Sequence, residues 1–305
     1  MSFLLDEFSS NAFNSIFLSE FFSSSYSSNL QYNSHSFFRF YRGGFPMDLN
    51  LSHQRVLVTG GSKGIGYAIS EAFLMEGADV TIVARSENEL KHAADKLFKS
   101  TGCKPKYFSF DLSEVEERKD LYQKVGDIDI LVNNAGAIPG GNLLTVKIDD
   151  WLSSWNLKVF GYIHLCQLFL PNMKEKQSGT IINIIGMGGR AVNSNYICGA
   201  GGNAALIGFT QAIGSETPNY NVRVFGINPS ATLTDRMVQL YKVRAEEEMG
   251  NPNRWEELLN SSKMPFGRVK LPEEVGALTV MLSSSKVHYL SGTVIDLDGG
   301  GQWAK

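Results

Sequence analysis

VLVTGGSKGIG, from Val56 to Gly66, joins a short apolar run to a turn with glycines at Gly60, Gly64 and Gly66. The apolar run predicts a buried strand, and the residues from Gly64 onward predict the start of a helix. Glycine at such a turn lets the backbone approach a ligand closely, and a helix N-terminus offers unpaired N–H groups and the positive end of a dipole. The stretch therefore predicts a strand, a phosphate-binding turn and a helix.

Short β-branched runs alternate with longer amphipathic stretches in the rest of the chain. The expected strands are apolar without polar alternation, and they cover residues 56–59, 80–84, 107–110, 128–132, 180–185, 222–227 and 293–297. Apolar runs of this kind are typical of strands buried on both faces. Seven such strands with helices between them predict an α/β fold, a Rossmann-type doubly wound parallel sheet in three α/β/α layers, with its ligand crevice at the carboxyl ends of the strands.

The composition argues against several classes of function. Among 305 residues, 28 Lys and Arg face 31 Asp and Glu, and the formal charge is −3, so no basic surface predicts nucleic-acid binding. The sequence contains no run of 18 apolar residues, so it predicts no membrane span. Three separated cysteines and five dispersed histidines predict neither a disulfide framework nor a metal site, and they favour a reducing, cytoplasmic location.

The first 46 residues differ from the rest because Ser, Phe, Asn and Tyr dominate them and Lys is absent. They lack the basic start and apolar run of a signal peptide and the spread arginines of a mitochondrial presequence. We expect a low-complexity, disordered extension over residues 1–46 and one domain over residues 47–305, with Met47 as its natural first residue. The alternative is an aromatic tail that docks on a partner or a membrane surface.

The glycine turn and several later motifs resemble the short-chain dehydrogenase/reductase family. Its spacing TGxxxGxG is matched by Thr59 to Gly66, and the likeness runs from about Leu51 to the end of the chain. Further motifs in the family's order are Asp111-Leu112, NNAG at Asn133–Gly136, Asn156, INP at 227–229, Thr234 and DGG at 298–300. The resemblance implies hydride transfer between a nicotinamide cofactor and the carbonyl or alcohol of a small-molecule substrate. It also implies a homodimer or homotetramer, in which the helical segments 151–174 and 203–216 would pair with those of another copy.

The resemblance further implies where the cofactor binds. Asp111 and Leu112 are expected to flank the adenine, the loop at Asn133 to line the cofactor, and the segment after Pro229 to cover the nicotinamide. The residues expected to bind the cofactor are Thr59, Gly60, Ser62, Lys63, Gly64, Ile65, Gly66, Arg85, Asp111, Leu112, Asn133, Ala135, Gly136, Asn203, Pro229 and Thr234.

Two cations favour NADP(H) over NAD(H). An NAD-preferring site presents an acidic residue at the end of the second strand, whereas this chain reads VARS and places Arg85 there, with Lys63 inside the glycine loop. A 2′-phosphate would gain charge-assisted contacts from both side chains, and a carboxylate would repel it. The alternative is that both are ordinary solvated surface residues.

The catalytic stretch departs from the family pattern. There, a Ser after the fifth strand orients the carbonyl, a Tyr supplies the proton, and a Lys four residues on lowers the pKa of the phenol. In the ungapped register these positions hold Gly186, Gly199 and Asn203, the last of which begins NAALIGFT, similar to the family's KAALxxxT. A second register makes Tyr196 the catalytic Tyr and leaves Ala200 at the Lys position. Neither register provides the Lys.

We therefore expect an NADP(H)-dependent oxidoreductase with an atypical site, in which Tyr196, Asn156 and Arg190 assist. Asn156 matches the family Asn that anchors a water in the proton relay. The alternatives are an inactive NADP(H)-binding sensor or scaffold, and a lyase or isomerase that keeps the cofactor as a structural element. Residues 232–264 occupy the place of the variable substrate loop and predict a helical lid, whose apolar members are Met237, Leu240, Tyr241 and Trp255.

Overall fold

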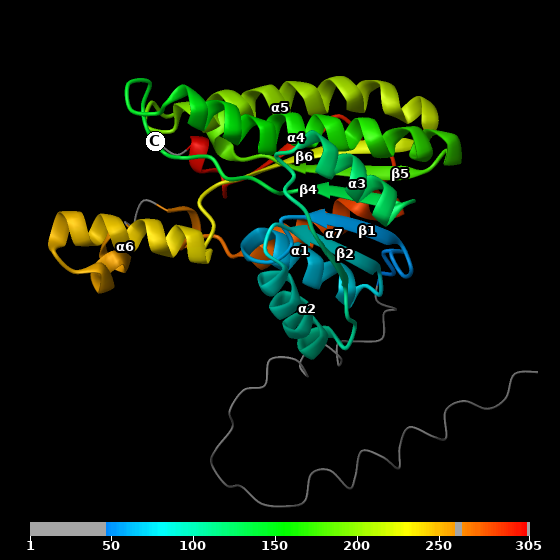
Figure 1. The fold of residues 1–305 in the computed structure, drawn as a ribbon, viewed down its shortest axis with the longest axis horizontal. Helices are drawn as coiled ribbons and strands as arrows, with labels where there is room; N and C mark the ends of the chain where they lie inside the picture. The colour runs from blue at the N-terminus through cyan, green and yellow to red at the C-terminus, as the bar shows by residue number, and fades with distance from the viewer. Residues whose placement is uncertain (1–46, 260–263, 304–305) are drawn as a thin grey trace, which may run out of the picture. The chain divides into compact units, whose positions relative to one another are not determined.

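Seven parallel strands form one sheet in the order β3-β2-β1-β4-β5-β6-β7, in a computed structural model that describes residues 47–259 and 264–303 (Figure 1). The strands are β1 (Arg55–Thr59), β2 (Asp79–Ala84), β3 (Lys106–Ser109), β4 (Ile130–Asn133), β5 (Gly179–Ile184), β6 (Val222–Pro229) and β7 (Thr293–Leu297). Each neighbouring pair is parallel. The expected Rossmann-type doubly wound fold is confirmed, with strand ends within two residues of the expected ones. The tail expected over residues 1–46 lies outside the described residues.

Helices cover both faces of this sheet (Figure 1). They are α1 (Gly64–Met75), α2 (Glu87–Thr101), α3 (Val115–Val125), α4 (Ile148–Lys176), α5 (Ile197–Glu216), α6 (Asp235–Met249) and α7 (Pro272–Ser283). α1 packs against α7 on one face, and α4 packs against both α3 and α5 on the other. In the described part of the chain, no helix has the length and apolar character needed to cross a membrane.

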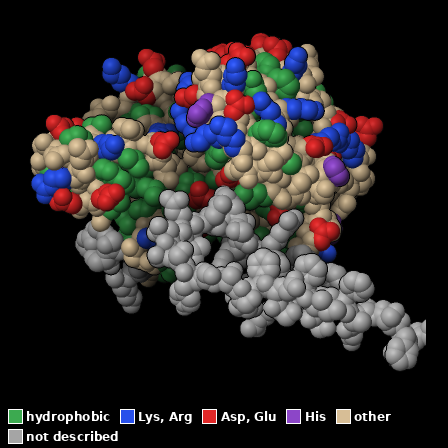
Figure 2. Space-filling model, turned by 90° about the horizontal axis from the view of Figure 1, so that it is seen from below, with side chains coloured by type: hydrophobic (Ala, Val, Ile, Leu, Met, Phe, Trp, Pro, Cys, Tyr) green, Lys and Arg blue, Asp and Glu red, His purple; other side chains and the backbone are tan. Residues whose placement is uncertain are grey.

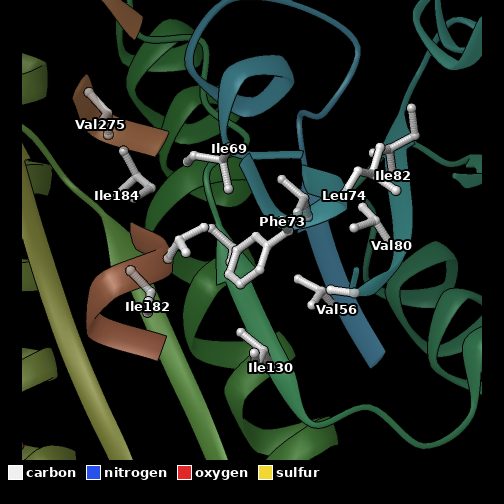
Figure 3. Packing of buried hydrophobic residues seen from close by; sticks show 14 of the residues in the cluster. Val56, Ile69, Phe73, Leu74, Val80, Ile82, Ile130, Ile182, Ile184 and Val275 are labelled. Carbon is white, nitrogen blue, oxygen red and sulfur yellow. The ribbon is translucent and has the colours of Figure 1, made fainter. Parts of the chain in front are cut away.

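Two apolar clusters fill the space between the sheet and the two helical layers. Figure 3 shows the first, in which the Phe73 ring of α1 lies among Val56, Ile130 and Ile182 from three neighbouring strands. All four side chains are at most 2% exposed, and full burial of such a side chain contributes about 1.5–3 kcal/mol. This packing fixes α1, and with it the turn that precedes α1.

The helix expected over residues 203–216 begins earlier, at Ile197. The four residues GAGG therefore belong to α5, although glycine inside a helix costs about 0.5–1 kcal/mol relative to alanine. Packing against α4 explains why glycine is present at Gly202, because a Cβ there would lie 3.1 Å from Val159 and 3.2 Å from the Trp155 indole nitrogen of α4. Trp155 also donates its indole N–H to the carbonyl oxygen of Cys198 at 3.2 Å. The glycines let α4 approach α5 closely.

Candidate active site

A cleft of about 580 Å³ lies at the carboxyl ends of β1, β2 and β4. The expected cofactor residues on its wall are Gly60, Ser62, Lys63, Gly64, Ile65, Arg85, Leu112, Ala135, Gly136 and Thr234. The other six expected residues, Thr59, Gly66, Asp111, Asn133, Asn203 and Pro229, are not on this wall. The crevice therefore lies where a doubly wound sheet places its ligand.

The glycine turn is shaped for a ligand with phosphate groups. A Cβ on Gly66 would lie 2.1 Å from the carbonyl oxygen of Gly60, so only glycine lets α1 start this close to β1. Gly60 itself has a φ of +67°, which L side chains rarely adopt. Among the described residues, no side chain caps α1, and its first turn holds no acidic residue. Free N–H groups at this helix end fit the pyrophosphate of a dinucleotide.

Thr59 and Asn133 are fully buried behind the cleft wall, and their hydrogen bonds fix the loops that form it. The Thr59 hydroxyl accepts from the backbone N–H of Asn134 at 2.9 Å and of Ala135 at 3.0 Å. Asn133 donates to the Asn183 side chain at 2.9 Å. Asn134 lies on the cleft wall in place of Asn133, and its amide donates to the carbonyl oxygen of Thr59 at 3.0 Å. The second Asn of NNAG is thus the one that faces the cleft.

Of the two residues expected to flank the adenine, one lies on the cleft wall and the other does not. Leu112 lies on the cleft wall, and the buried Arg118 fixes it by donating to its carbonyl oxygen at 2.5 Å. The Asp111 carboxylate turns to its own loop, where it accepts from the Ser113 hydroxyl at 2.7 Å. Phe110 supplies a further apolar wall.

Arg85 and Lys63 both lie on the cleft wall, as the argument for a 2′-phosphate requires. Lys63 is paired, because its ammonium lies 3.3 Å from a carboxylate oxygen of Glu89, and both side chains are exposed. Glu89 is also on the wall, and sequence reasoning missed it. An exposed pair of this kind contributes at most about 1 kcal/mol, so a phosphate can compete for Lys63.

The ring of Tyr196 fills the space beside the backbone of Gly199. Tyr196 precedes the first residue of α5, and its ring lies over Gly199, where an added Cβ would be 2.1 Å from Cε1 and Cζ and 2.6 Å from the hydroxyl oxygen. The loop after β4 holds Tyr196 there, because Gly141 N donates to Asn195 O at 2.7 Å and Ile197 N donates to Gly141 O at 3.3 Å. The phenol thus occupies the volume into which a side chain at position 199 would project.

Gly186 packs against Asn203, and Gly188 connects Asn203 to the Tyr196 ring, because a Cβ on Gly188 would lie 3.1 Å from the ring and 3.4 Å from the Asn203 amide nitrogen. Gly186 has a φ of +137°, a conformation that L residues rarely adopt, and its added Cβ would be 3.1 Å from the Asn203 amide nitrogen. The backbone after β5 is therefore built for glycine at this position. Asn203 is 2% exposed, and its side-chain oxygen has no hydrogen-bond partner among the described residues. A buried amide oxygen without a partner fits a site whose ligand supplies the missing donor.

Arg190 and Asn156 do not join Tyr196. The Arg190 guanidinium lies 2.8 Å from Asp296 and donates to Val294 O at 3.4 Å, so it is held on β7. Asn156 is exposed, and Arg118 donates to its carbonyl oxygen at 3.2 Å, whereas its side chain has no hydrogen bond to another described residue. Of the three expected catalytic side chains, the structure places only Tyr196 beside Gly199, and Gly188 lies between its ring and Asn203.

Burial raises the pKa of Tyr196, the positive charge of Arg236 opposes that rise, and Cys198 adds to it. Arg236 belongs to the first turn of α6 and lies on the cleft wall, where it donates to Ile138 O at 2.8 Å. Sequence reasoning missed Arg236, although it directly follows Thr234 and Asp235 in the motif TDR. The cation that acts on the phenol therefore comes from α6 rather than from α5.

Residues 54–245 match the family described as short chain dehydrogenase. The chain belongs to the short-chain dehydrogenase family. A 3-oxoacyl-(acyl-carrier-protein) reductase of Chlamydia muridarum is 32% identical over 261 residues, which cover 83% of this chain and 99% of the relative. The structure of L-sorbose reductase from Gluconobacter frateurii, complexed with NADPH and L-sorbose, matches with a TM-score of 0.79 and 29% identity, covering 85% of this chain and 100% of that one. An NADPH-dependent reductase involved in bacilysin biosynthesis matches with a TM-score of 0.75, 27% identity and coverage of 83% and 100%.

The chain is accordingly an oxidoreductase of the short-chain dehydrogenase type. The segment predicted to form a substrate lid, residues 232–264, contains α6 and a 3₁₀ segment, Pro252–Leu258, and its role as a lid stays a prediction. Thr234 caps α6, and its methyl group would lie 3.2 Å from a Cβ on Gly64, so this segment begins against the glycine turn. Leu240 and Val243 are more than half exposed, and Figure 2 shows hydrophobic side chains gathered in this region, at the left. Met237, Tyr241 and Trp255 are only partly exposed.

Proposed function

We propose that this short-chain dehydrogenase uses NADP(H) to reduce a carbonyl substrate and that Tyr196 delivers the proton. The observation that carries the proposal is the Tyr196 ring lying over Gly199, because it returns a phenol to the site despite the glycine at that position. The glycine turn with its uncapped helix, and the unpartnered Asn203 oxygen, are the features that would hold the dinucleotide. The relatives support reduction, since one is a 3-oxoacyl reductase and another binds L-sorbose with NADPH.

The residues divide the work as follows. When bound, the cofactor supplies the hydride. Tyr196 then donates its hydroxyl proton to the oxygen that becomes the alcohol, so its O–H bond breaks and a phenolate remains. The positive charge of Arg236 stabilises this phenolate, and solvent returns the proton. Asn156 and Arg190 are left out of this set because neither lies beside Tyr196, and assembly through α4 and α5 stays a prediction.

The direction of the reaction should depend on pH. Because burial raises the pKa of Tyr196 from 10, the phenol stays protonated through the neutral range and can act as an acid there. At saturating NADPH, carbonyl reduction is expected to lose no more than about twofold between pH 6 and 9, since the acid form of Tyr196 persists. Alcohol oxidation needs the phenolate and should keep rising beyond pH 10. Initial rates in both directions test this, and an oxidation rate that levels off near pH 8 would contradict it.

Arg85 should set the preference for NADPH. Replacing Arg85 by Ser removes a cation from the cleft wall, and we expect NADPH affinity to fall about 10- to 100-fold, as loss of one charge-assisted contact predicts. NADH affinity should change less than about threefold because NADH has no 2′-phosphate. Lys91→Ser is the matched control, since Lys91 is an exposed cation on α2 that is not on the wall. Fluorescence titration with both nucleotides measures the effect, and an unchanged NADPH-to-NADH ratio would refute the role of Arg85.

The function itself is tested by following NADPH absorbance with a panel of aldehydes, ketones, 3-oxoacyl thioesters and ketoses. We expect tight NADPH binding and turnover of at least one class of carbonyl. Binding of NADPH without turnover of any class would favour the sensor alternative. Failure to bind either nucleotide would end the proposal altogether.

A further inference from the structure

α4 carries a half-buried amine, that of Lys158, which the proposed chemistry does not use. Lys158 points inward two residues after the exposed Asn156, and its ammonium donates to the carbonyl oxygen of Ile185 at 2.6 Å. Burial, assisted by the positive charge of Arg236, lowers its pKa to about 8. Arg236 from α6 is the charged group that acts on this ammonium. Tyr162, one turn along α4, donates its hydroxyl to the neighbouring carbonyl oxygen of Ile184 at 3.1 Å.

The hydrogen bonding of this ammonium is incomplete. An ammonium has three N–H donors, and within the described residues Ile185 O is its only acceptor. Burying a charge without full hydrogen bonding is costly, and a Met side chain would fill nearly the same volume without that cost. Two donors remain for an oxygen-bearing ligand.

The Lys158 side chain lies close to the cleft wall and to Gly186. Ile185 directly precedes Gly186, and the Lys158 side chain also passes 3.1 Å from the place where a Cβ on Gly136 would lie. Gly136 is on the wall of the cleft, and Gly186 packs against Asn203 with its unpartnered oxygen. The Lys158 side chain thus passes the NNAG loop, and its ammonium ends one residue before Gly186, which packs against Asn203.

We propose that Lys158 supplies from α4 the ammonium that this chain lacks at position 203, and that it binds oxygen atoms of the nicotinamide nucleotide together with Asn203. Lys158 is a positioning residue, because its place is fixed by Ile185 O and it acts on the reaction through the bound nucleotide. The inference rests on the proposed function. It adds to that function a residue outside the family's catalytic motif.

The test compares Lys158→Met with the wild-type protein by NADPH titration, with Lys147→Met as a matched control on an exposed residue just before α4. Loss of one or two charge-assisted contacts should weaken NADPH binding about 10- to 100-fold. Wild-type affinity should fall as pH rises from 7 to 10, because the ammonium discharges near pH 8, and Lys158→Met should lack that fall. Lys158→Arg keeps the charge and should recover most of the affinity at pH 9.

Thermal unfolding without nucleotide separates this role from a structural one. Removing a buried and incompletely paired charge should leave the melting temperature of Lys158→Met equal to or above that of the wild type. A lower melting temperature with unchanged NADPH affinity would overturn the inference, as would a wild-type pH dependence in Lys158→Met. Should the wild-type protein fail to bind NADPH at all, the proposed function fails first, and the two failures are thereby distinguished.

Discussion

Tyr196→Phe is expected to slow carbonyl reduction by about 10²- to 10⁴-fold, the usual effect of removing a positioned general acid. The substitution deletes one hydroxyl and keeps the ring that packs over Gly199. NADPH affinity should therefore stay within about threefold of the wild-type value, so that the loss appears in kcat. Steady-state kinetics with the best carbonyl substrate, together with NADPH titration, measures both quantities.

Tyr220→Phe is the control for this substitution. Tyr220 lies at the other end of α5, where its hydroxyl bonds Glu216 and its ring receives Lys174 at 4.0 Å. It should reduce substrate at the wild-type rate. If Tyr196→Phe also keeps the wild-type kcat, Tyr196 is not the proton donor, and solvent must take that role.

The fold followed from local patterns that need no knowledge of distant contacts. Non-alternating apolar runs identified the strands, and Gly60, Gly64 and Gly66 identified the turn at the edge of the sheet. Gly66 illustrates why this succeeds, because its need for glycine comes from a carbonyl oxygen only six residues away. Short-range constraints of this kind are visible in the sequence.

The catalytic end of the cleft could not be predicted in the same way. Neither register describes the contact between these residues, because the ring of Tyr196 occupies the volume into which a side chain at position 199 would project. A one-dimensional alignment assigns one residue to one position and misses a side chain that reaches across a turn. Lys158 and Arg236 were missed for a related reason, since they come from α4 and α6 and meet the site only in three dimensions. The position of Lys158 on the side of α4 that faces the sheet was the one signal that could have identified it.

Gly199→Ala should abolish most of the activity by moving the phenol. The new methyl group would lie 2.1 Å from two ring carbons of Tyr196, against a normal carbon–carbon contact of about 3.5–4.0 Å. The ring must shift by more than an ångström or the turn before α5 must open, and misplacement by about 1 Å can cost 10²-fold in rate. We expect kcat to fall at least about 10²-fold, with about 1–3 kcal/mol of overpacking offset in part by the helix preference of alanine.

Gly208→Ala provides the control on the same helix, because nothing lies within 4 Å of its added Cβ. It should keep full activity and gain about 0.5–1 kcal/mol in the free energy of unfolding. The double variant of Gly199→Ala with Tyr196→Phe decides the mechanism. If both changes act by removing the same phenol from the same place, their effects on kcat will not add, and the double variant will be no slower than Tyr196→Phe. Additive losses would instead mean that Gly199 matters for a reason other than the ring above it.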